Sequence, residues 1–66
     1  MKETIKKPKA KLIGENGNIF NLLGIASVVL RKEGMVDQIQ EMNNRVWKSQ
    51  SYDEALAIIM EYVEVY

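Results

Sequence analysis

The chain has 66 residues, equal numbers of acidic and basic residues, an apolar content of 47%, and neither cysteine nor histidine. This length allows one domain with a small core, and the apolar content is typical of a globular domain rather than a disordered tail. The missing residue types exclude disulfides and catalysis by histidine or cysteine, and they leave few ligands for a structural zinc ion.

Charge is distributed unevenly along the chain. Residues 1–12 carry five lysines and one glutamate, a net charge of +4, whereas residues 33–66 carry seven acids and two bases, a net charge of −5. Such asymmetry indicates either an anionic partner or an arm that folds back onto its own domain. Residues 1–10 lack hydrophobic periodicity and contain Pro8, so we predict a flexible, disordered basic arm there, followed by a single domain over residues 11–66.

The segment over residues 11–24 contains the strongest local signals. A short apolar run, expected to be extended over residues 11–13, leads into a Gly-Glu-Asn-Gly-Asn turn and then into a long apolar stretch. Two structures are compatible with the Asn-Gly pair of this turn: a hairpin between residues 11–13 and 19–21, or a helix capped by Asn18. The helix is favoured, because the periodic pattern after Asn18 is too long for a hairpin strand.

The first predicted helix spans about residues 19–33 and is apolar on more than one side. Arg31 and Lys32 fall in its last turn, where positive charge suits the helix dipole, and Gly34 is a typical residue to end it. Gly24 costs about 1 kcal/mol relative to alanine in a helix interior, so we expect another backbone to approach closely there. The main apolar face consists of Ile19, Leu22, Leu23, Ala26, Val29 and Leu30, and the apolar residues outside it are Phe20, Ile25 and Val28.

Two further helices are predicted. The second spans about residues 36–49, and Trp47 falls outside its apolar stripe. The third begins with a capping box, in which Ser51 accepts a hydrogen bond from the Glu54 N–H and the Glu54 side chain reaches back. The apolar stripes are Met35, Ile39, Met42 and Val46 for the second helix, and Tyr52, Ala55, Leu56, Ile59, Tyr62, Val63 and Tyr66 for the third. The predicted fold is therefore mainly α: a compact three-helix domain with a short extended N-terminal segment.

No arrangement of residues indicates an active site. The serines have no histidine to activate them, and no Ser-x-x-Lys spacing is present. The Gly-rich turn lacks phosphate-loop spacing, and Glu15 within it would repel a phosphate. Asp53, Glu54, Glu61 and Glu64 spread over the polar face of one helix instead of converging on a cation. We therefore predict a non-enzymatic protein without a cofactor, a metal or a small-molecule substrate.

Two groups of residues are candidate contact sites. Trp47 and the apolar residues outside the first helix's main face form the candidate protein interface, because aromatic residues dominate interface hot spots. The simpler alternative is that these residues cover a small core, and that alternative is favoured for the aromatic group of Trp47, Tyr52, Tyr62 and Tyr66. The lysines of the arm are the candidate nucleic-acid contact, since each can neutralise a phosphate, and the alternative is a solubilising arm. The interface candidates are Phe20, Ile25, Val28 and Trp47, and the nucleic-acid candidates are Lys2, Lys6, Lys7, Lys9 and Lys11.

The opening motif resembles that of a family of short uncharacterised proteins from bacteria, phages and mobile elements, chiefly of Gram-positive hosts. The family pattern is K-L-I-G-E-D-G-N-x-F-x-I-L-G, then a helix ending in A-G and a late S-x-x-Y-D. The chain departs from it at Asn16, where Asp is common, and at Glu33, where a small residue is usual. Residues 11–18 match the pattern, with the exception of Asn16. The other matching positions are Phe20, Leu23-Gly24, Gly34 and Tyr52-Asp53. The resemblance covers about residues 11–65 and implies a fold and a mobile-element setting, but no activity.

The residue patterns predict a protein-interaction module, and the resemblance implies that it is of phage or mobile-element origin. Its partner is expected to be a protein, a second copy of the chain being one version, and the alternative is an accessory nucleic-acid-binding protein that uses the lysine arm. The longest apolar stretch, residues 19–30, is too short to span a bilayer, and no small-residue cleavage site follows the lysines. We therefore expect no signal peptide, no membrane association and a cytoplasmic location.

Overall fold

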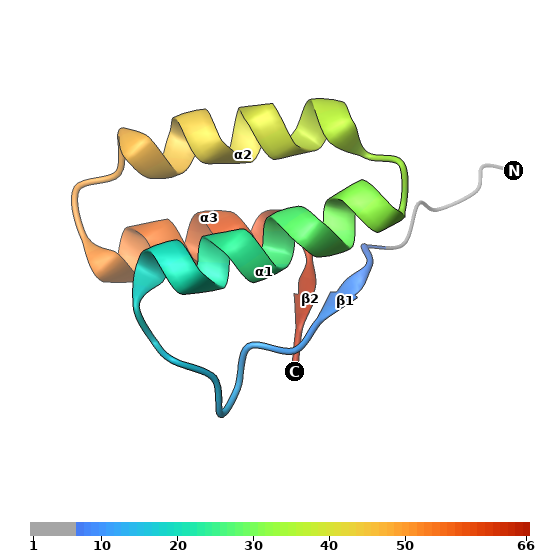
Figure 1. Cartoon of the computed structure of the whole chain (residues 1–66). Helices are drawn as coiled ribbons and strands as arrows, with labels where there is room; N and C mark the ends of the chain where they lie inside the picture. Colours follow the sequence, from blue (N-terminus) through green and yellow to red (C-terminus); the bar gives the residue numbers. More distant parts are fainter. Residues whose placement is uncertain (1–6) are drawn as a thin grey trace, which may run out of the picture.

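The computed structural model describes residues 7–66, which form three helices and a two-stranded parallel sheet (Figure 1). Each helix packs against the other two, and the sheet joins the two ends of this part of the chain. This arrangement confirms the predicted mainly helical fold. The elements in chain order are β1 (Lys9–Ala10), α1 (Ile19–Lys32), α2 (Val36–Trp47), α3 (Tyr52–Tyr62) and β2 (Glu64–Val65).

Local signals set both ends of α1. The Asn18 side chain accepts a hydrogen bond from the backbone N–H two residues later, at 2.8 Å, which confirms the predicted cap and excludes the hairpin alternative. At the other end Gly34 has a φ of +76°, which glycine adopts without steric cost. The N–H groups of Gly34 and Met35 donate to the carbonyls of Arg31 and Leu30 at 3.0 and 2.9 Å. This is a Schellman motif, and it reverses the chain into α2.

The start of α3 carries the predicted cap with one difference. The Ser51 hydroxyl accepts from the Glu54 N–H at 3.1 Å, as a capping box requires. The Glu54 carboxylate accepts from the Gln50 N–H at 3.0 Å, so it reaches one residue further back than expected. The cap therefore fixes the α2–α3 loop as well as the helix start.

The core lies between the three helices and one face of the sheet. Its largest fully buried side chains are Leu30, Met42, Ile59 and Val63. Leu30, Met42 and Ile59 belong to α1, α2 and α3, and Val63 directly follows α3. All three helices therefore contribute to one cluster. The other buried core residues are Ala10, Leu12, Leu22, Leu23, Ala26, Val46, Ala55, Ile58 and Tyr62.

The apolar face predicted for the third helix needs three corrections. Tyr52 and Tyr66 are exposed, although both were expected on that face, and Ile58 is buried, although it was not. The helix also ends at Tyr62, because Val63 is extended at φ −136° and ψ 153°. The β-branched and aromatic residues at the end of the sequence thus form a strand, in agreement with their intrinsic preference.

The strands β1 and β2 run parallel, with Lys9 opposite Glu64 and Ala10 opposite Val65. Ala10 is completely buried, whereas Lys9 is exposed. The small sheet therefore has an inner face against the helices and an outer face in solvent, as expected from the alternation of side chains along a strand.

Hydrogen bonds extend this pairing beyond the two strands. The Pro8 carbonyl accepts from the Glu64 N–H at 2.8 Å, and the Tyr66 carbonyl accepts from the Leu12 and Ile13 N–H groups, both at 2.9 Å. The predicted extended segment at residues 11–13 is therefore tied to the C-terminal residues, although the strand itself begins two residues earlier.

The predicted flexible arm over residues 1–10 is wrong for its last residues. Pro8 takes part in the ladder, and Ala10 belongs to the core. The sequence signal was weak, because a two-residue strand is too short to reveal an alternating pattern. The remaining part of that arm, residues 1–6, lies outside the described residues.

The burial of Ala10 can be tested with Ala10→Gln. This variant places a long amide side chain in the core, and we expect the free energy of unfolding to fall by about 2–4 kcal/mol. Chemical denaturation followed by circular dichroism measures the change. Lys9→Gln introduces the same side chain at the exposed neighbouring position, where we expect a change within about 0.5 kcal/mol. Equal effects of the two variants would contradict the packing of β1 described above.

Candidate protein interface

An open groove of about 530 Å³ lies at the end of the bundle where α1 and α3 begin and α2 ends. Figure 1 places these three helix ends on the same side of the molecule, away from the sheet. None of the residues that line the groove carries a formal charge. Its apolar and aromatic lining residues are Ile19, Phe20, Val46, Trp47, Tyr52 and Ala55.

Three aromatic side chains, Phe20, Trp47 and Tyr52, form the rim of this groove, and we call them the aromatic end. The rings of Phe20 and Trp47 pack against each other, with centroids 5.5 Å apart and planes at 48°. Trp47 is nevertheless 71% exposed, Phe20 57% and Tyr52 44%. Aromatic pairs of this geometry are favourable, so the two rings are held together while much of their surface stays in water.

Helix geometry explains why Phe20 and Trp47 are exposed. Each directly follows an inward-facing residue, Ile19 in α1 and Val46 in α2. One residue further along a helix turns the side chain by about 100°, which carries both rings from the core to the groove. Their contact across the α1–α2 boundary then follows from the packing of these two helices.

Tyr52 contributes a polar connection to the aromatic end. Its hydroxyl donates to the Gly17 carbonyl at 2.6 Å, which ties the loop before α1 to the first turn of α3. The sequence places this side chain on the core face of its helix and also in the aromatic group of Trp47, Tyr52, Tyr62 and Tyr66, for which covering the core was favoured over an interface. Membership of that aromatic group was therefore the sequence signal for its role.

Three of the four predicted interface residues are exposed, and the fourth is not. Phe20 and Trp47 are in contact, and Val28 is half-exposed two turns further along α1. Ile25 is only partly exposed and packs against the core. It is therefore a core-covering residue, as in the simpler alternative considered for this group.

The expected close approach of a backbone to Gly24 is wrong within this chain. Gly24 is exposed, and a Cβ atom built on it meets no atom within 4 Å. Its cost to the helix, about 1 kcal/mol relative to alanine, is therefore not explained by packing inside the described chain.

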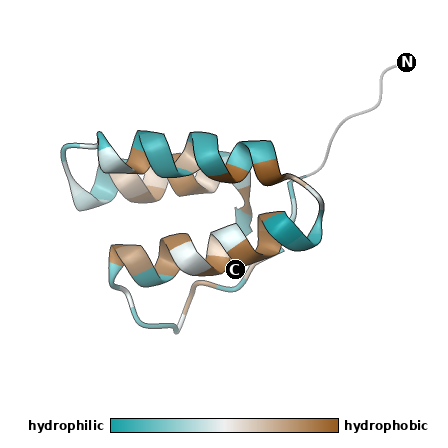
Figure 2. Ribbon diagram, turned by 45° about the horizontal axis from the view of Figure 1, so that its top comes forward, coloured by the Kyte–Doolittle hydropathy of each residue, from teal (hydrophilic) through white to brown (hydrophobic). Residues whose placement is uncertain are grey.

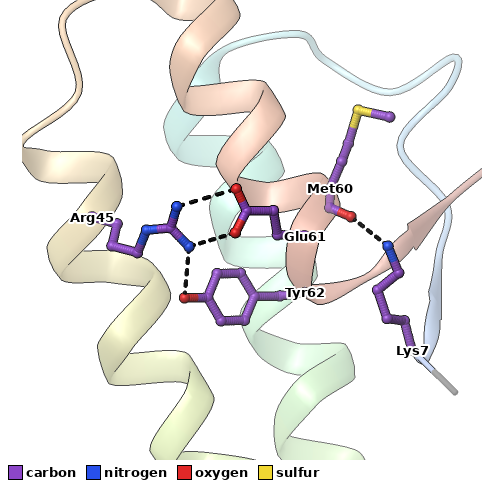
Figure 3. A network of polar contacts seen from close by, with 5 residues as sticks. All are labelled: Lys7, Arg45, Met60, Glu61 and Tyr62. Carbon is purple, nitrogen blue, oxygen red and sulfur yellow. Dashed lines mark hydrogen bonds and ion pairs between the residues drawn. The ribbon is translucent and has the colours of Figure 1, made fainter. Parts of the chain in front are cut away.

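Each of the three described candidate lysines lies near a polar or acidic group of its own chain. The Lys7 ammonium donates to the Met60 carbonyl at 2.9 Å, as Figure 3 shows. Lys11 lies 3.5 Å from the Glu15 carboxylate, and Lys9 is paired in register with Glu64. The other two candidates for nucleic-acid contact, Lys2 and Lys6, lie outside the described residues.

The strongest polar network joins α2 to α3 (Figure 3). Arg45 donates to both carboxylate oxygens of Glu61, at 2.6 and 3.1 Å, and to the Tyr62 hydroxyl at 3.1 Å. These hydrogen bonds lower the pKa of the Glu61 carboxyl and raise the pKa of Arg45, so the pair stays ionised. The network lies outside the groove and links α2 to α3.

Two other types of site find no support in the described part of the chain. No group of three or more acidic side chains lies close enough to hold a metal ion in residues 7–66. None of the three helices described is long and apolar enough to cross a membrane.

The tie between Tyr52 and Gly17 is tested by Tyr52→Phe. Loss of the donor leaves the Gly17 carbonyl to water, and we expect the free energy of unfolding to fall by about 0.5–1 kcal/mol. Tyr66→Phe is the matched control, because the Tyr66 hydroxyl makes no hydrogen bond within residues 7–66. Indistinguishable stabilities of the two variants in chemical denaturation would contradict a structural role for this contact.

The ion pair predicts a pH-dependent stability difference between the wild type and Glu61→Gln. Because the pKa of Glu61 is lowered in the folded state, its contribution is fully present above its ordinary value of 4.5. It disappears as the pH falls through the lowered pKa. In chemical denaturation, the difference in the free energy of unfolding between the wild type and Glu61→Gln should be constant from pH 7 to about pH 4.5. It should then shrink as the pH falls to 2.5. Glu33→Gln, which removes an acid outside this network, should not reproduce that trend.

Comparison of the chain with protein-family models, with curated proteins and with solved structures found no match.

Proposed function

We propose that this chain is a non-enzymatic protein-interaction module that binds its partner at the aromatic end, formed by Phe20, Trp47 and Tyr52. The observation that carries this proposal is the exposure of Trp47, the single tryptophan of the chain, beside Phe20 and an uncharged groove. Tryptophan and tyrosine are enriched at binding hot spots, and burial of their apolar surface is favourable.

The geometry of the groove also supports a macromolecular partner over a small ligand. The groove is open, and its rim consists of large flat side chains from three helices. Small-molecule sites usually enclose most of their ligand and present a few convergent polar groups. A protein segment that covers the rings would bury more apolar surface here than a small molecule within the groove.

The lysine-based alternative has less support. Lys7 and Lys11 both donate to carbonyls of their own chain, and Lys9 lies beside an acid across the sheet. Nucleic-acid binding through phosphates needs cations that are free to exchange their counterions.

The resemblance of residues 11–65 to phage and mobile-element proteins supports a phage or mobile-element setting for this module.

The proposal is tested by replacing Trp47 with a photo-crosslinking phenylalanine analogue in cells that express the native gene. We expect irradiation to yield an adduct that contains the chain and a protein partner, identified by mass spectrometry. The control places the same analogue at Glu41, an exposed residue of α2 that does not line the groove. Adducts at neither position, or the same adducts at both, would refute the aromatic end as the docking site.

A further inference from the structure

We infer that the outward face of α1 is a homodimer interface, on which a second copy of this chain packs antiparallel with Gly24 at the two-fold axis. The inference rests on the proposed function, because it names the partner that covers Phe20 and Trp47.

The outward face of α1 runs along its whole length. At 100° per residue, Phe20, Gly24, Val28 and Arg31 fall within one narrow arc, directly opposite the core residue Ala26. Figure 2 shows hydrophobic colour along most of the α1 ribbon, in contrast to the largely hydrophilic α2. A surface helix normally places polar residues on this arc, so its apolar residues indicate a second contact.

Gly24 lies at the centre of this arc. It lowers the stability of α1 in the single chain, and no contact within the described chain requires a glycine there. A side chain there would have open space, and the helix would be more stable with it. What glycine permits is the close approach of another backbone. The approaching element must come from outside the described chain, and two α1 helices that cross at Gly24 would each supply the space that the other needs.

An antiparallel crossing makes the face complementary to itself. A two-fold axis at Gly24 places Phe20, four residues before it, beside Val28 of the second copy, four residues after it. The large ring of one copy therefore meets the small side chain of the other at both ends of the contact. A parallel crossing would instead set ring against ring and valine against valine.

Charge favours the same direction. The last turn of α1 carries Arg31 and Lys32, and its first turn carries no acid. A parallel pair would bring four cations together at one end, whereas an antiparallel pair separates them and also aligns the helix dipoles favourably. No charged residue lines the groove at the aromatic end, so no cation there opposes Arg31 and Lys32 of the other copy.

Arg31 has a specific position in this arrangement. Three residues beyond Val28, it extends past Phe20 of the second copy and reaches Trp47 of that copy, whose ring centroid is 5.5 Å from the Phe20 ring. Its guanidinium makes no ion pair within residues 7–66. Arginine over an indole ring is a favourable cation–π contact.

The available area suits a weak dimer. Taking about 200 Å² for each aromatic side chain, the exposed fractions of Phe20 and Trp47 leave roughly 250 Å² per copy. Two copies then supply about 500 Å² from these rings alone, against about 1,200 Å² for a small stable interface. The rings therefore supply less than half of that area, and Val28 and Arg31 add to it, so we expect a weak dimer with dissociation constants of about 1–100 µM.

Sedimentation of the full chain across this concentration range is the direct test, and Trp47 fluorescence follows the same transition on dilution. We expect the wild type to change from one chain to two, and Gly24→Gln to weaken the association at least about tenfold. Gly24→Gln leaves the monomer folded, since the position is open and glutamine favours helix. Ala57→Gln is the matched control, a small-to-large change at an exposed position within α3, and it should still dimerise. A wild type that stays monomeric, or equal effects of the two variants, overturns the inference.

The direction of packing is tested with disulfides, because the chain has no cysteine of its own. Phe20→Cys and Val28→Cys chains are mixed and oxidised. We expect the mixed disulfide to exceed twice the amount of each symmetric one, the proportion that random pairing of equal amounts gives, since antiparallel packing brings positions 20 and 28 together. A mixed disulfide at or below that proportion would overturn the antiparallel arrangement.

Failure of the dimer can be separated from failure of the interaction module. A wild type that stays monomeric but forms an adduct with another protein through position 47 overturns the dimer and leaves the proposed function standing. A monomer without any position-specific adduct overturns both.

Discussion

The fold depends on burial of one face of α1 between α2 and α3. A chain of this length buries only about 60% of its unfolded surface and has no disulfide to support it, so every element must contribute to one core. Leu30, Met42 and Ile59 represent the three helices in that core, and Val63 represents the segment that leads into β2. Ala10 of β1 and Leu12 just after it belong to the same cluster, so the first residues of the described chain also contribute to the core.

The helices could be predicted from the sequence because their signals are local. The cap at Asn18, the glycine at position 34 and the hydroxyl of Ser51 each act within a few residues of the helix end that they define. The pairing of β1 with β2 could not be predicted in this way. It joins residues more than fifty positions apart, and each strand has only two residues, so neither periodicity nor turn chemistry indicates it.

The candidate site was predictable only in part, for a geometrical reason. Phe20 and Trp47 fall outside the apolar stripes of their helices, which identified them as exposed but not as neighbours. Ile25 also falls outside its stripe, yet α1 packs against two helices and buries a wider arc than a single stripe. Tyr52 lies on the predicted apolar stripe of α3 and is nevertheless exposed. The first turn of α3 lies at the end of the bundle, where no neighbouring element covers the apolar face of the helix.

The parallel arrangement of β1 and β2 has a mechanical consequence. A pull on the N-terminal side of β1 and the C-terminal side of β2 acts along the strands in opposite directions, because the two strands point the same way. The load is therefore a shear that falls on the hydrogen bonds from Pro8 to Ile13 together, instead of opening them one after another. Tension applied between residues 7 and 66 would therefore have to break these bonds together.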